Sequence, residues 1–242
     1  MSTLKADIRV TGQDIFTSSA TQETDLGALG TSGDGRYFRY VLAGSSTNLV
    51  PGKLQQGPAQ DTTNYNPSGG LAVAAAAIGA TSVTLTGSLT IGVNALAGAI
   101  MSVAVTPGQG YSYKVASNSA VSSAANCAVT LEDPILVALT TSSKVTFAVS
   151  PFNGVIVNPT TATGMPVGVA VYPVVKAQYG WVQVQGPVSC LTDAGTAVGL
   201  GVAPSAAVAG AVKTIAATLS QVGYAINTCV DTEYDVIYLT LG

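Results

Sequence analysis

The stretch from residue 167 to 191, VGVAVYPVVKAQYGWVQVQGPVSCL, constrains the fold more than any other part of the chain. Trp181, Gln183 and Gln185 alternate with Val182 and Val184, and period-two alternation is typical of a strand with two different faces. We expect two strands joined by a short turn at 178–180, with the second run ending at 186–187. Trp181 is the only tryptophan of the chain.

Similar short strand patterns recur along the chain, whereas helix signals are scarce. The two best helix candidates, 71–78 and 206–217, are weakened by glycine and β-branched residues. The ending DVIYLTL is apolar on both parities, which is typical of a strand covered on both faces. The sequence therefore predicts an all-β protein, with a sandwich-like or barrel-like C-terminal domain.

Three segments differ in composition and predict the domain organisation. Residues 1–35 begin with an alternating run at 3–10 and continue as a polar, glycine-rich stretch, which we interpret as an extended N-terminal arm. Residues 36–70 and 151–242 together form the expected β-domain, and residues 71–150 form a second β-rich unit. The arm is either a solvated, mobile terminus or a docking arm that pairs with a sheet edge elsewhere.

Charge is unusually sparse, because only 9% of the residues are charged, against roughly 25% in ordinary soluble proteins. Either Thr, Ser and Ala keep the surface soluble, or other subunits cover much of it; we favour the second explanation. The net charge is −3 and no basic cluster occurs, so we expect no direct nucleic-acid partner. No run approaches the roughly 20 apolar residues of a membrane-spanning helix, and the N-terminus has no apolar signal core.

The chain has no histidine, which removes the commonest general base and metal ligand. No phosphate-binding or dinucleotide-binding glycine motif occurs, and the three cysteines form no CxxC pair. We therefore expect no enzyme activity, no cofactor and no metal. Cys127, Cys190 and Cys229 fit small buried thiols in a reducing cytoplasm, with a Cys190–Cys229 disulfide as the alternative.

Two groups of acidic residues allow sharper hypotheses than the composition does. Asp231, Glu233 and Asp235 share one parity and either bind Ca²⁺ or, as we favour, form a solvated turn. Glu132 and Asp133 are neighbours in sequence, so on a strand their side chains would point apart, and we disfavour a hydrolytic carboxylate pair. Neither group identifies a catalytic site.

Aromatic and basic residues near the first long strand and the tryptophan are the candidate contact residues. Aromatic side chains on strands mark either a carbohydrate-binding face or, more often, a core or subunit interface. We favour the core or interface and predict that one set of residues contacts a capsid or a neighbouring subunit: Lys5, Arg9, Arg36, Tyr37, Phe38, Arg39, Tyr40 and Trp181.

The C-terminal third resembles the small capsid decoration, or cement, proteins of tailed bacteriophages. The resemblance lies in GVAVYPVV, YGWVQVQGPVSCLTD, AVGLGVAP and VGYAINTCVDTEYDVIYLTL, between residues 168 and 241. In that family a strand ending in "GV" or "GP" leads to a turn, a "vG" bend, an "iGyAl" segment and a closing Val/Leu strand. Here these steps fall at 186–187, 198–199, 222–225 and 236–241.

The resemblance implies a protein made in the host cytoplasm that adds to the outside of the expanded capsid as a homotrimer and clamps the major capsid protein. We therefore expect a virion structural protein that binds no nucleic acid or membrane. In this interpretation residues 1–35 and the strands around 36–54 contact the shell. The alternative is a receptor-binding or carbohydrate-binding β-module of a virion fibre or cell surface.

Overall fold

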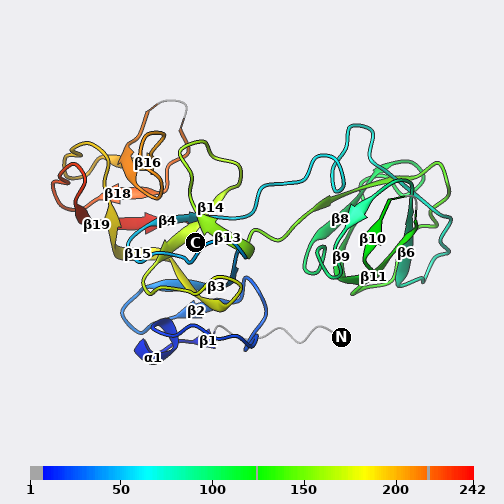
Figure 1. Ribbon diagram of the computed structural model, residues 1–242, viewed down its shortest axis with the longest axis horizontal. Helices are drawn as coiled ribbons and strands as arrows, with labels where there is room; N and C mark the ends of the chain where they lie inside the picture. The colour runs from blue at the N-terminus through cyan, green and yellow to red at the C-terminus, as the bar shows by residue number, and fades with distance from the viewer. Residues whose placement is uncertain (1–7, 124, 217–218) are drawn as a thin grey trace. The chain divides into compact units, whose positions relative to one another are not determined.

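The computed structural model describes residues 8–123, 125–216 and 219–242, and the expected all-β fold class is confirmed (Figure 1). In these residues the single helix is α1 (Gly12–Ile15), which has only one turn, and no helix is long and apolar enough to cross a bilayer. The chain forms two compact units. Unit 1 contains Met1–Pro58 and Pro151–Gly242, and unit 2 contains Ala59–Ser150.

The centre of unit 1 is a closed ring of five strands. Each strand pairs with the next and the last pairs with the first, in the order β3 (Tyr37–Ala43), β13 (Asn153–Val157), β4 (Leu54–Gln56), β14 (Pro166–Ala170) and β15 (Tyr179–Leu191). Buried side chains from four of these strands, including Val41, Val155, Val167 and Val182, form one core cluster. The ring is therefore filled by small branched side chains.

The long strand β15 joins this ring to a second sheet. Residues 179–185 pair with β3, whereas residues 185–191 pair with β19 (Tyr234–Thr240). The change of partner occurs beside a register irregularity at 183–185 and at Gly186, whose φ of 92° is accessible to glycine at little cost. The expected end of the strand at 186–187 is therefore a bend within it. The connection to β14 is also longer than the expected turn at 178–180, because it spans residues 171–178.

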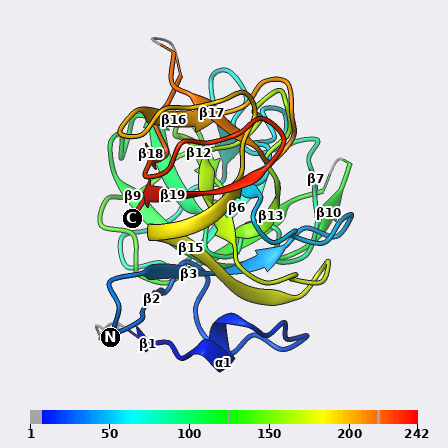
Figure 2. The ribbon, with the colours of Figure 1, turned by 90° about the vertical axis from the view of Figure 1, so that its left-hand side faces the viewer.

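The second sheet of unit 1 continues from β19 to three short strands (Figure 2). These are β18 (Gly223–Ala225), β16 (Gly201–Pro204) and β17 (Val212–Thr214). A bridge between Thr192 and Val212 connects β17 back to the residue after β15, so this sheet also curls on itself. Its core contains Val188, Cys190, Val202 and Ile237.

Residues 8–31 differ from the expected extended N-terminal arm, because they pack onto unit 1. β1 (Ile8–Arg9) adds in parallel to β2 (Leu29–Thr31), and β2 pairs with β3. Val10 and Ile15 are buried against Phe38, Tyr40 and Trp181. An apolar cluster on β3 and β15 thus gains its cover from the polar-looking N-terminal segment.

Unit 2 is a closed six-stranded barrel with its own core of buried apolar side chains, among them Leu85, Met101, Val115 and Phe147. The barrel order is β11 (Cys127–Leu131), β6 (Ser82–Thr86), β5 (Leu71–Val73), β12 (Lys144–Ala148), β8 (Ile100–Val105) and β9 (Ser112–Asn118). A separate two-stranded sheet pairs β7 (Thr90–Ile91) with β10 (Val121–Ser122).

The boundary between the units lies at residues 58–59, upstream of the expected position at 70–71. The intervening loop is bonded to unit 2: the Tyr65 carbonyl accepts from the Phe147 N–H at 2.8 Å, and Asn64 Oδ1 accepts from the Thr90 N–H at 2.9 Å. The two weak helix candidates also differ from expectation, because they contain β5 and β17; Ala217 lies outside the described residues.

Candidate functional site

Three of the four predicted aromatic residues, Phe38, Tyr40 and Trp181, come together on one face of the β3–β15 pair. Tyr40 lies opposite Trp181 in the ladder, and Phe38 lies opposite Gln183. The Tyr40 ring meets the Trp181 ring edge-to-face at 5.1 Å and stacks on the Tyr179 ring at 5.9 Å. The Tyr40 hydroxyl accepts a hydrogen bond from the Glu23 N–H at 3.1 Å, and burial raises the pKa of the phenol.

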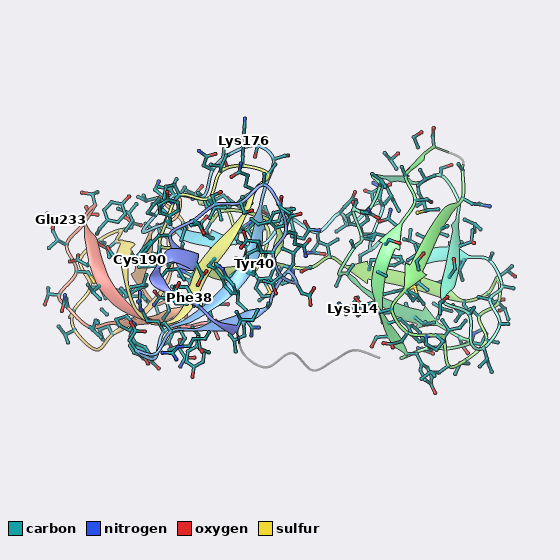
Figure 3. The ribbon with its side chains drawn as sticks, turned by 90° about the horizontal axis from the view of Figure 1, so that it is seen from below. Phe38, Tyr40, Lys114, Lys176, Cys190 and Glu233 are labelled. Carbon is teal, nitrogen blue, oxygen red and sulfur yellow. The ribbon has the colours of Figure 1, made fainter. Side chains whose placement is uncertain are left out.

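These aromatic rings are core side chains, which is one of the two roles, core or interface, that the sequence favours; in the single chain they do not face a partner. Phe38 and Tyr40 lie inside unit 1 (Figure 3), and Trp181 is only 5% exposed. The reason is the cover that Val10 and Ile15 supply, and the polar character of residues 11–35 conceals the part of Ile15. Lys5 lies outside the described residues.

The predicted basic residues of the same strands do not converge on one site. Arg36 pairs with Asp34 at 2.8 Å and lies over the Phe38 ring at 5.6 Å. The hydroxyl of Ser32 and then the Arg36 guanidinium lower the pKa of Asp34 to about 2. Arg39 instead donates to the Gly27 carbonyl at 2.8 Å, so both arginines fix local loops.

Two further predicted residues, Arg9 and Tyr37, lie nearer to the surface. Tyr37 is half-buried, and Arg9 is exposed on β1 at the mouth of a pocket of about 360 Å³. We call this the Trp181 pocket; it is lined by Ile8, Arg9, Val10, Asp14, Glu23, Thr24, Tyr40 and Trp181. Three of the eight predicted contact residues therefore meet at one concave site.

A different surface, which the sequence reasoning missed, gathers exposed aromatic side chains on the second sheet. Tyr224 on β18 lies opposite Tyr238 on β19, and Tyr238 lies opposite Pro187 on β15. Tyr224, Tyr234 and Tyr238 are 45%, 52% and 38% exposed. We call this surface the tyrosine face, and it consists of Pro187, Ser189, Tyr224, Tyr234, Val236 and Tyr238.

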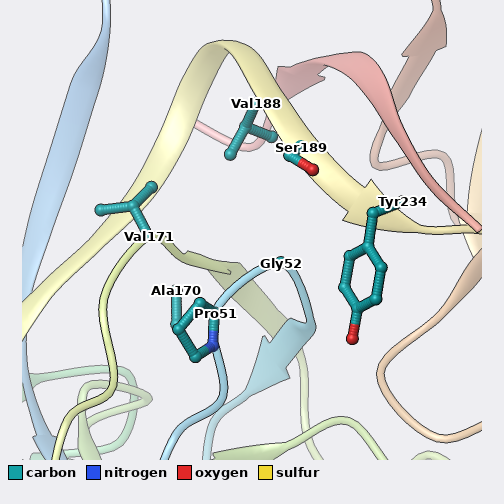
Figure 4. Close-up of a pocket in the computed structure, with 7 residues that line it drawn as sticks. All are labelled: Pro51, Gly52, Ala170, Val171, Val188, Ser189 and Tyr234. Carbon is teal, nitrogen blue, oxygen red and sulfur yellow. The ribbon is translucent and has the colours of Figure 1, made fainter.

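An apolar pocket of about 270 Å³ adjoins the tyrosine face and shares Ser189 and Tyr234 with it (Figure 4). Its other walls come from the turn at 51–52, the end of β14 and Val188. A side-chain carbon at Gly52 would lie 2.6 Å from the Tyr234 ring, so glycine is required for the ring to lie against this turn. None of the residues that line this pocket or form the tyrosine face is charged.

The signal for the tyrosine face is the closing strand itself. The pattern DVIYLTL predicts cover on both faces, but only Ile237 and Leu239 are fully buried. Tyr234 and Tyr238 occupy the other parity and face solvent. The closing strand therefore has one buried parity and one exposed parity that carries aromatic side chains, and exposed apolar surface of this kind is typical of interaction sites.

The acidic and sulfur-bearing groups have structural roles. Asp231 Oδ1 accepts from the Ala194 N–H at 2.9 Å, and Asp235 Oδ2 accepts from the Val230 N–H at 2.7 Å, so these carboxylates fix turns. Glu132 pairs with Lys114 at 2.8 Å. Within the described residues, no three Asp, Glu or Cys side chains are grouped to hold a metal ion.

The three cysteines carry free thiols, so the alternative Cys190–Cys229 disulfide is not formed. All three side chains are buried. Burial, with a smaller effect of the neighbouring Cys229, raises the pKa of Cys190 to about 12. This thiol is therefore a core group and a poor nucleophile at neutral pH.

No family model, curated protein or solved structure matches this chain.

Proposed function

We propose that this protein is a virion structural protein that binds the outer surface of a bacteriophage capsid and stabilises it, without enzymatic activity. In this proposal the partner is the major capsid protein, and the chain acts as a homotrimer. The observation that carries the proposal is the tyrosine face with its adjoining apolar pocket.

The tyrosine face has the physical properties of a protein-binding surface. Tyrosine is enriched and charge is depleted at the centres of protein interfaces. Tyrosine buries a large area while ordering few torsions, so little conformational entropy is lost on binding. Burying these positions would desolvate no ion, which favours an equally uncharged patch on the shell.

The position of the tyrosine face agrees with the family resemblance. The segments that resemble cement proteins lie between residues 168 and 241, and they supply most of β14 and all of β15, β16, β18 and β19. All members of the tyrosine face lie in this range. We therefore propose that this sheet, and not the N-terminal 35 residues, contacts the capsid. The reason is that residues 8–31 pack against their own chain.

Repetition explains how a modest contact can stabilise a shell. A trimer presents three copies of the same face, and simultaneous contacts act at a high effective concentration. Each contact can then be weak while the assembly stays attached. A small number of mobile charged side chains on the protein lowers the entropic cost of this attachment.

Co-sedimentation with capsids tests the proposal. Purified protein is mixed with expanded capsids of the source phage that lack it, and the pellet is assayed for a fixed, saturable ratio to the shell protein. We expect Tyr238→Glu to lower occupancy at least tenfold, because it would bury a charge. Tyr111→Glu is the matched control, since Tyr111 is 42% exposed but belongs to unit 2.

Two results would contradict the proposal. Absence of the wild-type chain from the capsid pellet would contradict capsid binding, and with it the proposed function. Equal occupancy of capsids by both glutamate variants would show that the chain binds capsids through a surface other than the tyrosine face.

A further inference from the structure

The apolar pocket beside the tyrosine face, which we call the Tyr234 pocket, has the arch of β15 as one wall (Figure 4). Ser189 lies in this wall, and Pro51, Gly52 and Ala170 lie across from it. The pocket volume of about 270 Å³ is below the roughly 300–1,000 Å³ of pockets that hold a whole small molecule. An apolar cavity of about 150 Å³ already holds benzene, so the Tyr234 pocket can hold one large apolar side chain.

The main chain of β15 determines which hydrogen-bonding groups this wall offers. In an antiparallel pair, alternate residues direct their N–H and C=O groups to the partner strand, and the residues between them direct theirs to the other edge. The Leu191 N–H donates to the Gly52 carbonyl at 2.7 Å, and the Pro187 carbonyl accepts from the Gln183 side-chain amide at 2.9 Å. Residues 187, 189 and 191 therefore point away from β19.

The hydrogen bonds of β19 show the same alternation independently. The Thr240 N–H donates to the Val222 carbonyl at 3.0 Å, so the even-numbered residues of β19 face β18, and Val236 opposite Ser189 is one of them. The Ser189 N–H and C=O therefore take no part in the β15–β19 ladder. Within the part of the chain that the structure describes, no other group bonds to them. The pocket wall thus carries one open donor and one open acceptor.

This pair of groups selects the chemistry of the occupant. An extended peptide offers an acceptor and a donor at the spacing of a strand, so it can bond to both Ser189 groups at once. The lining of the Tyr234 pocket is uncharged, so a side chain that enters it is apolar. We propose that this pocket binds an extended segment of the capsid protein, whose backbone bonds to Ser189 while a leucine or phenylalanine side chain fills the pocket. This contact rests on the proposed function for the identity of the partner.

A short peptide tests the contact without capsids. The probe is acetyl-Gly-Thr-Leu-Thr-Gly-amide, added to the full chain labelled with ¹⁵N. We expect a saturable shift of the Ser189 amide signal with a midpoint of about 1 mM, an ordinary affinity for one anchor side chain. The same peptide with alanine in place of leucine should bind about tenfold more weakly, because the apolar anchor is lost. Methylation of its three central amide nitrogens should also weaken binding about tenfold, because the donor to the Ser189 carbonyl is lost.

Substitutions in the protein test the same contact from the other side. Ser189→Pro removes the open donor but leaves the ladder with β19 intact, as Pro187 on the same parity does. We expect about tenfold weaker binding, followed on the Gly52 amide signal, whereas Ser189→Ala keeps the N–H and should bind like the wild type. Tyr234→Ala should weaken binding and Tyr224→Ala should not, because Tyr224 belongs to the tyrosine face but does not line the pocket. Thermal melts show whether each variant is folded.

Four results would overturn the proposal. These are no saturable response to the leucine peptide, equal binding of the alanine peptide, equal binding of the N-methylated peptide, and unchanged binding by a folded Ser189→Pro variant. Shifts of the same signals when the protein alone is concentrated would also overturn it, because they would identify a second copy as the occupant. Capsid co-sedimentation of the wild type tests the proposed function separately, so a failed peptide titration with intact co-sedimentation removes only this contact.

Discussion

At the scale of single residues, close contacts around Trp181 contribute to the stability of unit 1. Gly30 lies directly beneath Trp181: a side-chain carbon there would lie 2.7 Å from Trp181 Cζ3 and 2.7 Å from Val10 Cγ1. Such a carbon would separate the N-terminal cover from the strands that it covers. The requirement for glycine at this position is therefore steric.

We expect Gly30→Ala to lower the free energy of unfolding by about 1–3 kcal/mol, the usual cost of overpacking a core. Urea unfolding followed by Trp181 fluorescence measures the change. Gly33→Ala is the matched control, because a carbon there would meet only the end of the Arg9 side chain at 3.8 Å. Equal midpoints for the two variants would contradict a tight contact beneath the tryptophan.

A second residue-scale prediction concerns Cys190. Burial raises the pKa of its thiol from 9.0 to about 12, so the folded state holds the proton that the unfolded state loses first. The stability that this adds is complete below pH 9 and is lost as the pH rises towards 12. We expect the unfolding free energy of the wild type to fall more steeply over this range than that of Cys190→Ala.

Alkaline urea titrations of both proteins measure this difference, because other groups titrate alike in the two. Thiol labelling at pH 8 gives an independent check: all three cysteines are buried, so we expect labelling only after unfolding. Parallel stability curves above pH 9 would argue against a protonated core thiol.

At the scale of elements, the N-terminal segment is a structural part of unit 1. Deleting residues 1–35 would remove β1, α1 and β2 and expose Phe38, Tyr40 and Trp181. We expect this deletion to lower the melting temperature strongly and to shift Trp181 emission to longer wavelengths. Deleting residues 1–7 is the control and leaves all described elements in place. An unchanged emission maximum for the longer deletion would contradict the covering role.

The strands themselves were predictable from the sequence, whereas their pairing was not. Period two in Val182 and Val184 and in Ser82–Thr86 predicts strands, and β15 and β6 are there. Gly186 and Pro187 look like a strand end, because a local pattern does not reveal that a strand changes its partner at a bend. Residues 11–35 have no sustained periodicity, so Ile15 becomes recognisable as cover only when β3 and β15 are paired.

The candidate sites were less accessible to sequence reasoning than the fold. The chemistry of Tyr40 and Trp181 makes them recognisable as candidates, but Asp14 and Glu23, which line the same pocket, are far away in the chain and belong to no motif. Tyr224 and Tyr238 meet because β18 pairs with β19. Burial on one parity only is a property of the whole sheet, so the closing strand alone could not reveal it.

At the scale of the whole molecule, the two units have separate cores and two connections. Unit 2 is a closed barrel whose core cluster contains no residue of unit 1. The chain leaves unit 1 after Pro58 and re-enters it at Pro151, and these two points are neighbours: a side-chain carbon at Gly57 would lie 2.8 Å from the Pro151 carbonyl oxygen. Unit 2 is therefore an insertion in the sequence of unit 1, between two positions that lie close together in unit 1.

This arrangement predicts that each unit folds without the other. Replacing residues 59–150 by a short glycine–serine linker should leave unit 1 folded, because the linker has only a small gap to span and loop closure costs little for short loops. Residues 59–150 expressed alone should also unfold cooperatively. Because Trp181 lies in unit 1, its fluorescence follows the unfolding of that unit. The free energy of unfolding measured in this way should agree between the shortened chain and the full chain within about 0.5 kcal/mol.

The shortened chain and the isolated unit 2 also test which unit attaches to capsids. If the tyrosine face carries attachment, the shortened chain should co-sediment with capsids and the isolated unit 2 should not, because every residue of that face belongs to unit 1. Far-ultraviolet circular dichroism and thermal melts establish first that both proteins are folded. Attachment by isolated unit 2, with loss of attachment by a folded shortened chain, would transfer the docking role to the inserted barrel and remove it from the sheet that resembles cement proteins.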